Sequence, residues 1–535
     1  MGIVHPGVSA SGSLGEKEMS ILGELSRRRL LRTGALGGVG VAVLAACGET
    51  KEVIKEVPVE VIKEVQVAGE TVVKEVQVEV PVEVVKEVEK IVEVEVEVEV
   101  EGETKVVEKI VEVEAELVTT TVNAWFNQAT QMANFEEKVV GHYHRQQDAF
   151  RLESILVPNN ELTTKMTAAI AGGAPPDVVR VGGGVLGNAF FRQGVMHDID
   201  QFDPSVRDSE DIVWAIRTTL TWKDKIWAMP VNSGTNALYY NRNLYDAAGI
   251  GDPPTTFEGI AENAAKIQSL GTIDGNPVSG IEWPSEPKQG TANTMFGMMF
   301  GHGAFGVDES GTKVLLDAPE MLATLTWLKE NFLDAGTMPI KQNLNETGMT
   351  NDFGTGLVGQ YIAYPSRLQN AIENLGGDVG LTTRMPAGPV ADFLPIGFGE
   401  LMLPKNAQNT EGGWHFTDFI GNDPENDSIW CSAFGQIPPR YSYRDSVTFS
   451  AYRKANPGTQ PFIDGQKSAF PQYWGPATNQ VWTAYGEAQE AVIFGEDPAS
   501  ALGAAQEKAQ GDLDLALETD DALLRSFPEL TGGYA

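Results

Sequence analysis

Aromatic and amide side chains directly follow short runs of β-prone residues in the middle of this chain. Sugars present flat apolar C–H faces and a rim of hydroxyl groups, so a sugar site needs aromatic rings together with polar groups of paired geometry. Residues at or just after three such runs supply groups of this kind: Trp125, Asn127, Gln128, Asn160, Gly183 and Gly184. The glycines would let the backbone approach a ligand closely.

The elements that would position these residues alternate between strands and helices. Runs 119–126, 152–158 and 177–181 predict strands, and runs 135–150 and 162–171 predict helices. This order is typical of a mainly parallel sheet covered by helices, and ligands of such sheets bind beyond the carboxyl ends of the strands. The folded part exceeds the usual size of one hydrophobic core, so we expect an α/β fold with two lobes.

Other chemistries find less support. The run 182–187 fits the dinucleotide pattern G-x-G-x-x-G, with Asp203 at a suitable distance, but the segment after it is too short for a full crossover helix. His142 and His144 would point to different faces of a helix, so no metal site is expected there. No cofactor is expected. A carboxylate pair for glycoside cleavage stays open, because acidic residues are plentiful.

The charge balance argues against one class of partner. The chain has 535 residues and a formal net charge of −35. An acidic surface would repel a phosphate backbone, so nucleic acid is not an expected partner. Only Cys47 and Cys431 occur, so no intramolecular disulfide remains if Cys47 is modified. After residue 46 no apolar run is long enough to predict a membrane-spanning helix.

The N-terminal segment has the order of an export signal. A basic cluster at 27–32 precedes an apolar run rich in small residues at 33–46, and Cys47 follows. Leu-Ala-Ala-Cys at its end is similar to the bacterial lipobox, and Ser-Arg-Arg at 26–28 resembles a twin-arginine signal, although Leu30 stands where Phe is commoner. We expect a signal peptide over 1–46, a lipid on Cys47 and a place on the extracytoplasmic face of the cell membrane.

A low-complexity segment follows the cysteine. Between 48 and 117 there are 21 Glu and 8 Lys residues, and 92–99 alternates strictly between Val and Glu. An isolated strand of this pattern would leave its valine face uncovered, so a packed sheet is not expected. We expect a self-repelling tether over 47–118, with a coiled coil as the alternative, ahead of a folded body at 119–535.

The body resembles a known family through motifs that occur in a fixed order. Three of them are Gly-Gly-Ala-Pro-Pro-Asp-Val-Val at 172–179, Gln-Gly-Val-Met-His-Asp-Ile at 193–199, and Met-Pro-Val-Asn-Ser-Gly-Thr-Asn-Ala-Leu-Tyr-Tyr-Asn at 229–241. They are similar to motifs of the extracellular solute-binding proteins of ABC importers, of the maltose-binding type. Leu-Pro-Lys-Asn-Ala at 403–407 continues the resemblance, which covers about 119–510.

The resemblance implies a type II periplasmic-binding-protein fold, in which two lobes close on a ligand. It implies lobe 1 at about 119–231 and 366–400, lobe 2 at about 235–360 and 404–535, and crossing strands near 232–235, 361–366 and 399–404. Such a protein would be a monomeric, non-enzymatic carrier that delivers its solute to a membrane permease and, through it, to an ATPase.

The resemblance also implies ligand contacts at the crossings and in lobe 2. They are Asn232 and Ser233 at the first crossing, Trp283 at the end of run 278–283, Tyr364 and Arg367 at the second crossing, Glu400 at the third, and the late pair Tyr473 and Trp474. Phe398 departs from the small residues that the family often carries near Glu400. The other tryptophans are assigned to packing: Trp214, Trp222, Trp227, Trp327, Trp414 and Trp482.

Aromatic residues near the cleft favour a mono- or oligosaccharide as the solute, whereas Arg367 would equally suit an anionic one. The expected function is therefore the capture of a sugar or sugar-like solute between two lobes. The alternative from another class is a surface-anchored glycoside hydrolase or another carbohydrate-active enzyme.

Overall fold

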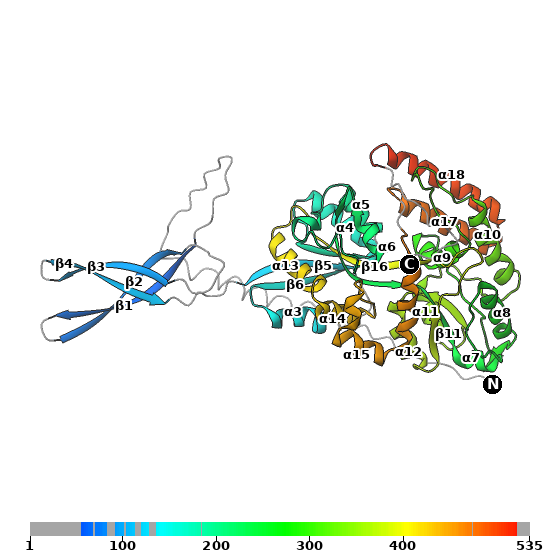
Figure 1. Cartoon of the computed structure of the whole chain (residues 1–535), viewed down its shortest axis with the longest axis horizontal. Helices are drawn as coiled ribbons and strands as arrows, with labels where there is room; N and C mark the ends of the chain where they lie inside the picture. The colour runs from blue at the N-terminus through cyan, green and yellow to red at the C-terminus, as the bar shows by residue number, and fades with distance from the viewer. Residues whose placement is uncertain are drawn as a thin grey trace, which may run out of the picture. The chain divides into compact units, whose positions relative to one another are not determined.

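The backbone divides into two compact units, Met1–Ala115 and Glu116–Ala535 (Figure 1). In this computed structural model, the first unit is described by its backbone at 55–67, 70–82, 91–100 and 103–112. The second unit is described at 119–127, 135–182, 185–472 and 475–521. The expected signal peptide and Cys47 lie outside the described residues. Within the described part, no helix is both long and apolar enough to cross a membrane.

The valine- and glutamate-rich segment contains two antiparallel hairpins, although no packed sheet was expected there; the tether over 47–118 stays a prediction. Strand β1 (Lys55–Val67) pairs with β2 (Glu70–Val82), and β3 (Ile91–Val100) pairs with β4 (Glu103–Glu112). In the first hairpin the register sets Val57, Val59 and Val61 opposite Val80, Val78 and Val76. Each strand with alternating valine thus pairs with a strand of similar pattern in the same segment.

Lobe 1 is built on a sheet with the strand order β10-β16-β7-β5-β6. Strands β5, β6 and β7 are parallel, and β16 runs antiparallel to both of its neighbours. The strands are β5 (Thr120–Asn127), β6 (Phe150–Val157), β7 (Val178–Gly182), β10 (Met229–Thr235) and β16 (Leu394–Met402). The predicted β-α-β-α-β opening with a parallel sheet is confirmed.

Helices cover this sheet, and one carboxylate ties two of its parts together. Asp177, which precedes β7, accepts hydrogen bonds from the backbone N–H of Asn123 at 2.8 Å and of Asn409 at 2.7 Å. Asn409 caps the first turn of α13 through Gly412. The helices of this lobe are α3 (Gly141–Gln146), α4 (Asn159–Ala171), α5 (Val185–Arg192), α6 (Trp214–Leu220), α13 (Thr410–Gly421) and α14 (Pro424–Phe434). Helix α15 (Val447–Ala455) contacts α14, but its buried Phe449 packs in a cluster of lobe 2.

Lobe 2 has a smaller sheet and a helical core. Strand β11 (Ala237–Asn241) lies between β14 (Gln360–Ala363) and β15 (Gly380–Arg384). Its helices are α7 (Arg242–Ala247), α8 (Phe257–Gln268), α9 (Gln289–Gly301), α10 (Pro319–Leu328), α11 (Glu346–Phe353), α12 (Leu368–Leu375), α16 (Gln460–Gly465), α17 (Thr478–Ile493) and α18 (Pro498–Leu517).

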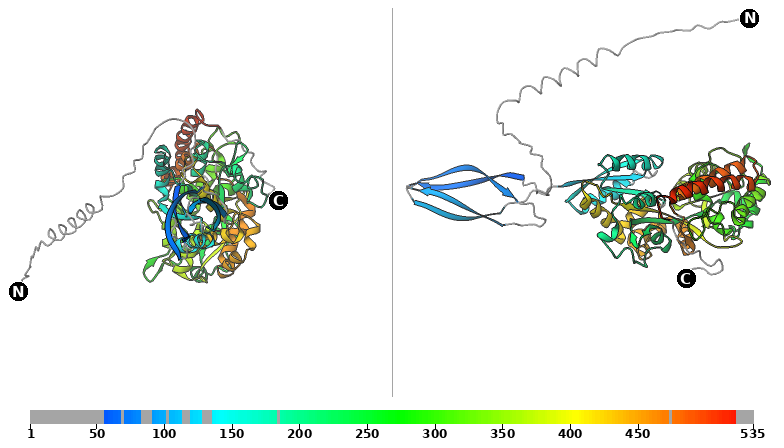
Figure 2. Two further views of the ribbon diagram at one scale, coloured as in Figure 1. Left: turned by 90° about the vertical axis from the view of Figure 1, so that its left-hand side faces the viewer. Right: turned by 90° about the horizontal axis from the view of Figure 1, so that it is seen from above.

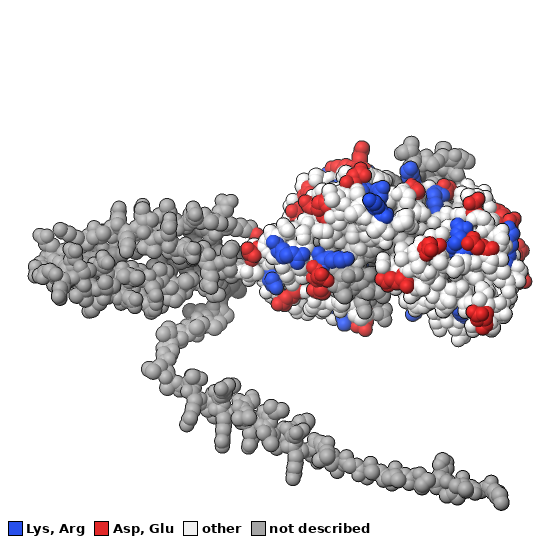
Figure 3. All heavy atoms as spheres, turned by 90° about the horizontal axis from the view of Figure 1, so that it is seen from below, with Lys and Arg blue, Asp and Glu red and all other residues white. Residues whose placement is uncertain are grey.

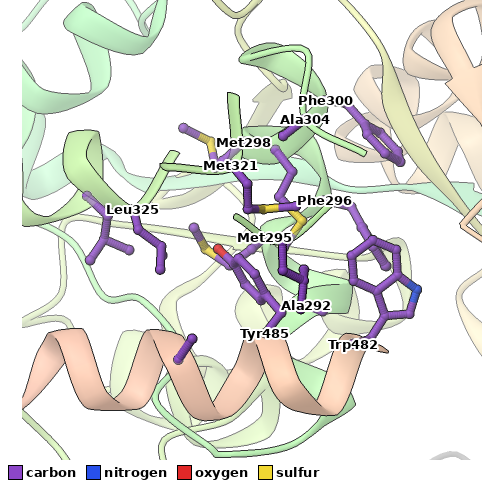
Figure 4. Packing of buried hydrophobic residues seen from close by; sticks show 14 of the residues in the cluster. Ala292, Met295, Phe296, Met298, Phe300, Ala304, Met321, Leu325, Trp482 and Tyr485 are labelled. Carbon is purple, nitrogen blue, oxygen red and sulfur yellow. The ribbon is translucent and has the colours of Figure 1, made fainter. Parts of the chain in front are cut away.

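The core of lobe 2 gathers around α9, which is buried on nearly all sides. Its Phe296 ring meets the Trp482 ring of α17 edge to face, with centroids 4.5 Å apart. Met295 and Met298 fill the space toward Tyr485 and α10 (Figure 4). This packing holds α9 and α17 in fixed positions beside the region where the chain crosses between lobes.

The hydrophobic clusters divide the crossing segments differently from the sequence expectation. Leu368 packs in a cluster of lobe 2, although 366–400 was expected in lobe 1. Phe416 and Trp430 pack in the core of lobe 1, although 404–535 was expected in lobe 2. The reason is that β16 re-enters the sheet of lobe 1, and α13 and α14 then cover that sheet.

Lobe 2 contains a buried carboxylate that should make its stability depend on pH. Glu282 is fully buried, and Lys341 bridges it to Asp352. Burial raises the pKa of Glu282 to about 7 from an ordinary value of 4.5, against the opposing effect of Lys341. The folded protein therefore binds more protons than the unfolded chain between these values, and stability falls as pH rises through this window.

We expect Glu282→Gln to flatten the dependence of unfolding free energy on pH between about 4.5 and 7. The slope that is lost is at most about 1.4 kcal/mol per pH unit. Urea denaturation at several pH values measures it. Glu161→Gln, which breaks a surface pair with Lys165, is the control and should leave the slope unchanged. Equal slopes in wild type and Glu282→Gln would contradict the assignment.

Candidate functional site

The candidate site lies where the chain leaves two strands on either side of a short stretch of β16. Strand β7 ends at Gly182 opposite Gly399, and β17 (Ala469–Phe470) ends opposite Pro395. The ends of β7 and β17, called the strand exits here, therefore lie on either side of residues 396–398 of β16. Because β5 and β6 run parallel to β7, their carboxyl ends lie at the same edge of the sheet.

Tyr364 forms one wall of this region, and it directly follows β14 of lobe 2, although its segment was expected to cross between the lobes. Its ring lies over Gly397, where an added Cβ would stand 2.8 Å from the ring. Its hydroxyl donates to the carbonyl of Asn293 at 3.3 Å and accepts from Gln472 Nε2 at 2.7 Å. Burial raises the pKa of this hydroxyl, so it stays protonated at neutral pH. The half-buried ring is thus fixed in place by both lobe 2 and the strand-crossing region.

Arg367 stands close to Tyr364 but is engaged with a carboxylate. Its Nη2 lies 3.2 Å from Glu346 Oε2, and the other oxygen of Glu346 accepts from the backbone N–H of Tyr364 at 2.9 Å. The Nε of Arg367 is buried and has no hydrogen-bond partner among the described residues. Glu346 therefore neutralises much of the positive charge that would attract an anionic solute.

Asn232 and Glu400 belong to a buried polar cluster of lobe 1. The Oδ1 of Asn232 accepts from Arg180 Nη2 at 3.1 Å and from Trp430 Nε1 at 3.3 Å. Glu400 has an exposed fraction of 0%. Burial lowers the pKa of Arg180 to about 10, and the negative charge of Glu400 opposes this shift. Here Asn232 and Glu400 organise the strands next to the site rather than lining an open surface.

Ser233 joins the first crossing to a neighbouring segment. It is fully buried and exchanges backbone hydrogen bonds with Ile437 at 2.7 and 3.0 Å. Its hydroxyl donates to the Ile437 carbonyl at 3.1 Å and accepts from Gln466 Nε2 at 2.9 Å. The residue thus ties the first crossing to the segment after α14.

Of the three tryptophans expected at the site, the two that the structure describes differ in their surroundings. Trp283 is buried in the core of lobe 2, where its ring lies 5.3 Å from Phe332 and 6.1 Å from Trp327. Trp125 lies on β5 between Ile155 and Val179 and is half-buried. Trp125 is therefore the more accessible of the two.

Several expected contacts stay predictions. Gln128, Gly183, Gly184, Tyr473 and Trp474 lie outside the described residues, and only the backbone of Asn127 and Asn160 is described. By chain position, the two glycines follow the end of β7, and the late aromatic pair follows Gln472. These segments leave the two strands that end beside 396–398.

The structure adds residues that the sequence reasoning missed. Trp214, assigned to packing, is 36% exposed, and its ring lies 6.2 Å from that of Phe470. Trp214 begins α6 of lobe 1, whereas Phe470 packs in the core of lobe 2, so the pair spans both lobes. Asn293 and Gln472 fix the Tyr364 hydroxyl. For Gln472 a signal existed, since it directly precedes Tyr473 and Trp474.

The charges around the site give little support for metal or polyanion binding. Among the residues that the structure describes, no group of three or more His, Cys, Asp or Glu side chains could hold a metal ion. Basic and acidic side chains are interspersed on the face shown in Figure 3. Beside the Tyr364 ring, the Tyr364 hydroxyl and the Gln472 amide already pair with each other and with backbone carbonyls, so the ring is the group that the arrangement offers to the apolar face of a solute.

Comparisons with known proteins identify the family and the fold of the chain. A family model described as bacterial extracellular solute-binding protein matches residues 128–427. The sn-glycerol-3-phosphate-binding periplasmic protein UgpB of Escherichia coli K12 is 23% identical over 441 residues, which cover 77% of this chain and 94% of that protein.

Two solved structures show the same two-lobed fold. UgpB from Mycobacterium tuberculosis, in complex with glycerophosphocholine, has a TM-score of 0.64 at 20% identity and covers 75% of this chain and 100% of its own. The GacH receptor of Streptomyces glaucescens, solved unliganded and with acarbose, has a TM-score of 0.65 at 18% identity and covers 74% and 99%.

Proposed function

Because this chain belongs to the bacterial extracellular solute-binding proteins, we propose that it captures a sugar or sugar-like solute between its lobes and delivers it to the permease of an ABC importer. The chain is a solute-binding protein with a two-lobed fold; the solute class, the permease and the anchor are the proposed parts. The observation that carries the solute class is the placement of the Tyr364 ring, which is held over Gly397 beside two strand exits.

A neutral polyhydroxylated solute fits the described groups better than a strongly anionic one. An aromatic ring can pack on the C–H face of a sugar, and the nearby amides can exchange hydrogen bonds with its hydroxyl groups. The basic group closest to Tyr364 in sequence, Arg367, already pairs with Glu346. The relatives that bind glycerol phosphate and glycerophosphocholine nevertheless make phosphorylated polyols a necessary part of any screen.

Binding would act through the crossings between the lobes. A solute that contacts both lobes stabilises the closed arrangement, and its differential affinity for the two arrangements sets how far the equilibrium shifts. The permease would then distinguish loaded from empty protein by the relative position of the lobes. No bond in the solute needs to be broken in this process.

The function is tested by a thermal-shift screen of the full chain against sugars, polyols, sugar phosphates, amino acids and peptides, followed by calorimetric titration. We expect a concentration-dependent rise in melting temperature with a sugar or polyol, as mass action requires for a ligand of the folded state. Stabilisation only by amino acids or peptides would contradict the sugar assignment. Cleavage of an oligosaccharide during the incubation would favour the glycoside hydrolase instead.

A lipid on Cys47 would keep the protein near its permease. With the anchor in place, the protein should fractionate with membranes, and Cys47→Ala should release it into the medium. Cell fractionation followed by immunoblotting measures this. Cys431→Ala is the matched control, because its thiol is buried and should leave the location unchanged. Continued membrane association of Cys47→Ala would contradict a lipid anchor on Cys47.

A further inference from the structure

An arginine of lobe 1 forms an ion pair and hydrogen bonds with the residues that follow the last helix of lobe 2. Arg192, the last residue of α5, donates from Nε to Asp520 Oδ2 at 2.7 Å and from Nη2 to Asp520 Oδ1 at 2.8 Å. Its Nη2 also donates to the backbone carbonyl of Asp521. The side chain of Arg192 is only 2% exposed. A bidentate arginine–carboxylate pair of this geometry is among the stronger and more directional ion pairs in proteins.

A second ion pair lies beside the first. Lys223 Nζ lies 2.9 Å from Asp521 Oδ2. Both cations rest on the ring of Trp222, with Lys223 Nζ 4.3 Å and the Arg192 guanidinium carbon 5.1 Å from its centroid. Lys223 and Asp224 have positive φ values of 51° and 57°, which are typical of a tight turn between β8 (Thr221–Trp222) and β9 (Lys225–Ile226).

The two sides of this contact belong to different lobes. Phe191 and Trp222 pack with the core of lobe 1. The chain bearing Asp520 and Asp521 follows α18, whose Leu502 and Leu513 pack in the core of lobe 2. Figure 2 shows α18 lying along lobe 2 with one end directed toward lobe 1. The contact is therefore a bridge between lobes that is separate from the crossing strands.

We propose that Arg192, Lys223, Asp520 and Asp521 form an interlobe clasp that holds the lobes in the arrangement of this structure and positions α5 relative to lobe 2. Helix α5 begins just after the end of β7 beside the candidate site and ends at Arg192, so it spans only about 12 Å between site and clasp. A rotation of the lobes about the crossings that moves α5 away from α18 must break the clasp. The bridge therefore opposes lobe separation whichever solute the protein binds.

The Arg192–Asp520 pair of the clasp differs in burial from the exposed ion pairs of the described chain, the neighbouring Lys223–Asp521 pair included. Pairs between exposed side chains contribute little, because water and salt screen them and long side chains lose freedom. Lys508 and Glu487, which join α17 and α18 within lobe 2, are both about half exposed. Arg192 is almost fully buried, and its partners approach it from another lobe.

Pulsed electron paramagnetic resonance on the full chain tests the clasp. Spin labels are placed at Thr164→Cys on α4 and Glu507→Cys on α18, both exposed positions, in a chain that carries Cys47→Ser; Cys431 is buried. In the absence of solute, Asp520→Asn with Asp521→Asn should shift the interlobe distance distribution to longer and broader values. Glu487→Gln, the control within lobe 2, should leave it unchanged.

Charge reversal keeps the test decisive if the double variant folds poorly. Lys223→Glu should shift the distances in the same direction, and adding Asp521→Lys should bring them back toward wild type. Distributions that match wild type in both the Asp520/Asp521 and Lys223 variants would overturn the clasp. The readout needs no bound solute, so this outcome would leave the proposed function unaffected.

Discussion

Tyr364→Ala is expected to weaken solute binding by at least about tenfold, which corresponds to about 1.4 kcal/mol. The substitution removes the ring that lies over Gly397 and the hydroxyl that joins Gln472 to the carbonyl of Asn293. A ring held in this way needs no reorganisation when a solute arrives, so its loss removes both contact area and preorganisation. Calorimetric titration with the solute found in the screen measures the change.

Tyr364→Phe separates the two contributions of this residue. It keeps the ring and removes only the hydroxyl, so we expect an affinity between those of wild type and Tyr364→Ala. Thermal unfolding without solute checks that each variant is folded. Wild-type affinity in a folded Tyr364→Ala variant would show that the solute binds elsewhere.

Trp482→Ala is expected to lower the unfolding free energy by about 3–5 kcal/mol. The Trp482 ring is fully buried at the centre of lobe 2, where it meets Phe296 and lies against Gly306. Its Nε1 also donates to the backbone carbonyl of Gln472 at 3.2 Å. The surrounding helices cannot collapse fully into the space that the ring leaves, so the loss includes a cavity term.

Trp414→Ala is the matched control for this loss. Trp414 is half-buried and stacks on Phe202 with centroids 4.9 Å apart, so the same truncation removes less buried surface. We expect a smaller loss of unfolding free energy, measured by urea denaturation. Equal losses in the two variants would contradict the central place given to Trp482. Because Gln472 contacts Tyr364, Trp482→Ala should also weaken solute binding.

The strand ends that frame the site could be predicted from the sequence, because the switch between β-prone and helical runs is local information. The strand expected at 177–181 is β7, which ends one residue later at Gly182, and the parallel order of β5, β6 and β7 follows from the intervening helices. Tyr364 was placed at a crossing by resemblance, but the chain stays in lobe 2 on both sides of it, in β14 and α12. What the local pattern could not indicate is the partner strand β16, whose register with β7 joins residues more than 200 positions apart.

Burial of individual side chains was harder to predict than the elements that carry them. Trp283 was expected to face the cleft, yet it packs against Phe332, whereas Trp214 was assigned to packing and is partly exposed. A tryptophan suits both roles chemically, and the choice depends on helices contributed by distant parts of the chain. Ser233 shows the same limit, since its hydroxyl is taken up by Ile437 and Gln466.

Chain assignment at the crossings depends on tertiary packing in the same way. The third crossing was expected at 399–404, but Leu394 already packs in lobe 2 and Ile396 in lobe 1. The crossing thus lies at the start of β16, where a continuous strand gives no local signal. The clasp at Asp520 was equally hidden, because nothing near it in sequence points to Arg192.

Hydrogen exchange with and without the solute tests the central claim most directly. The full chain is incubated in deuterated buffer, and amide exchange is followed in peptides that contain 364–367, 396–399 and 471–475. If the solute binds beside the strand exits, exchange in these three segments slows when it is present and returns toward the free rate in Tyr364→Ala. Unchanged exchange there, with protection confined to other parts of the protein, would contradict the proposed site.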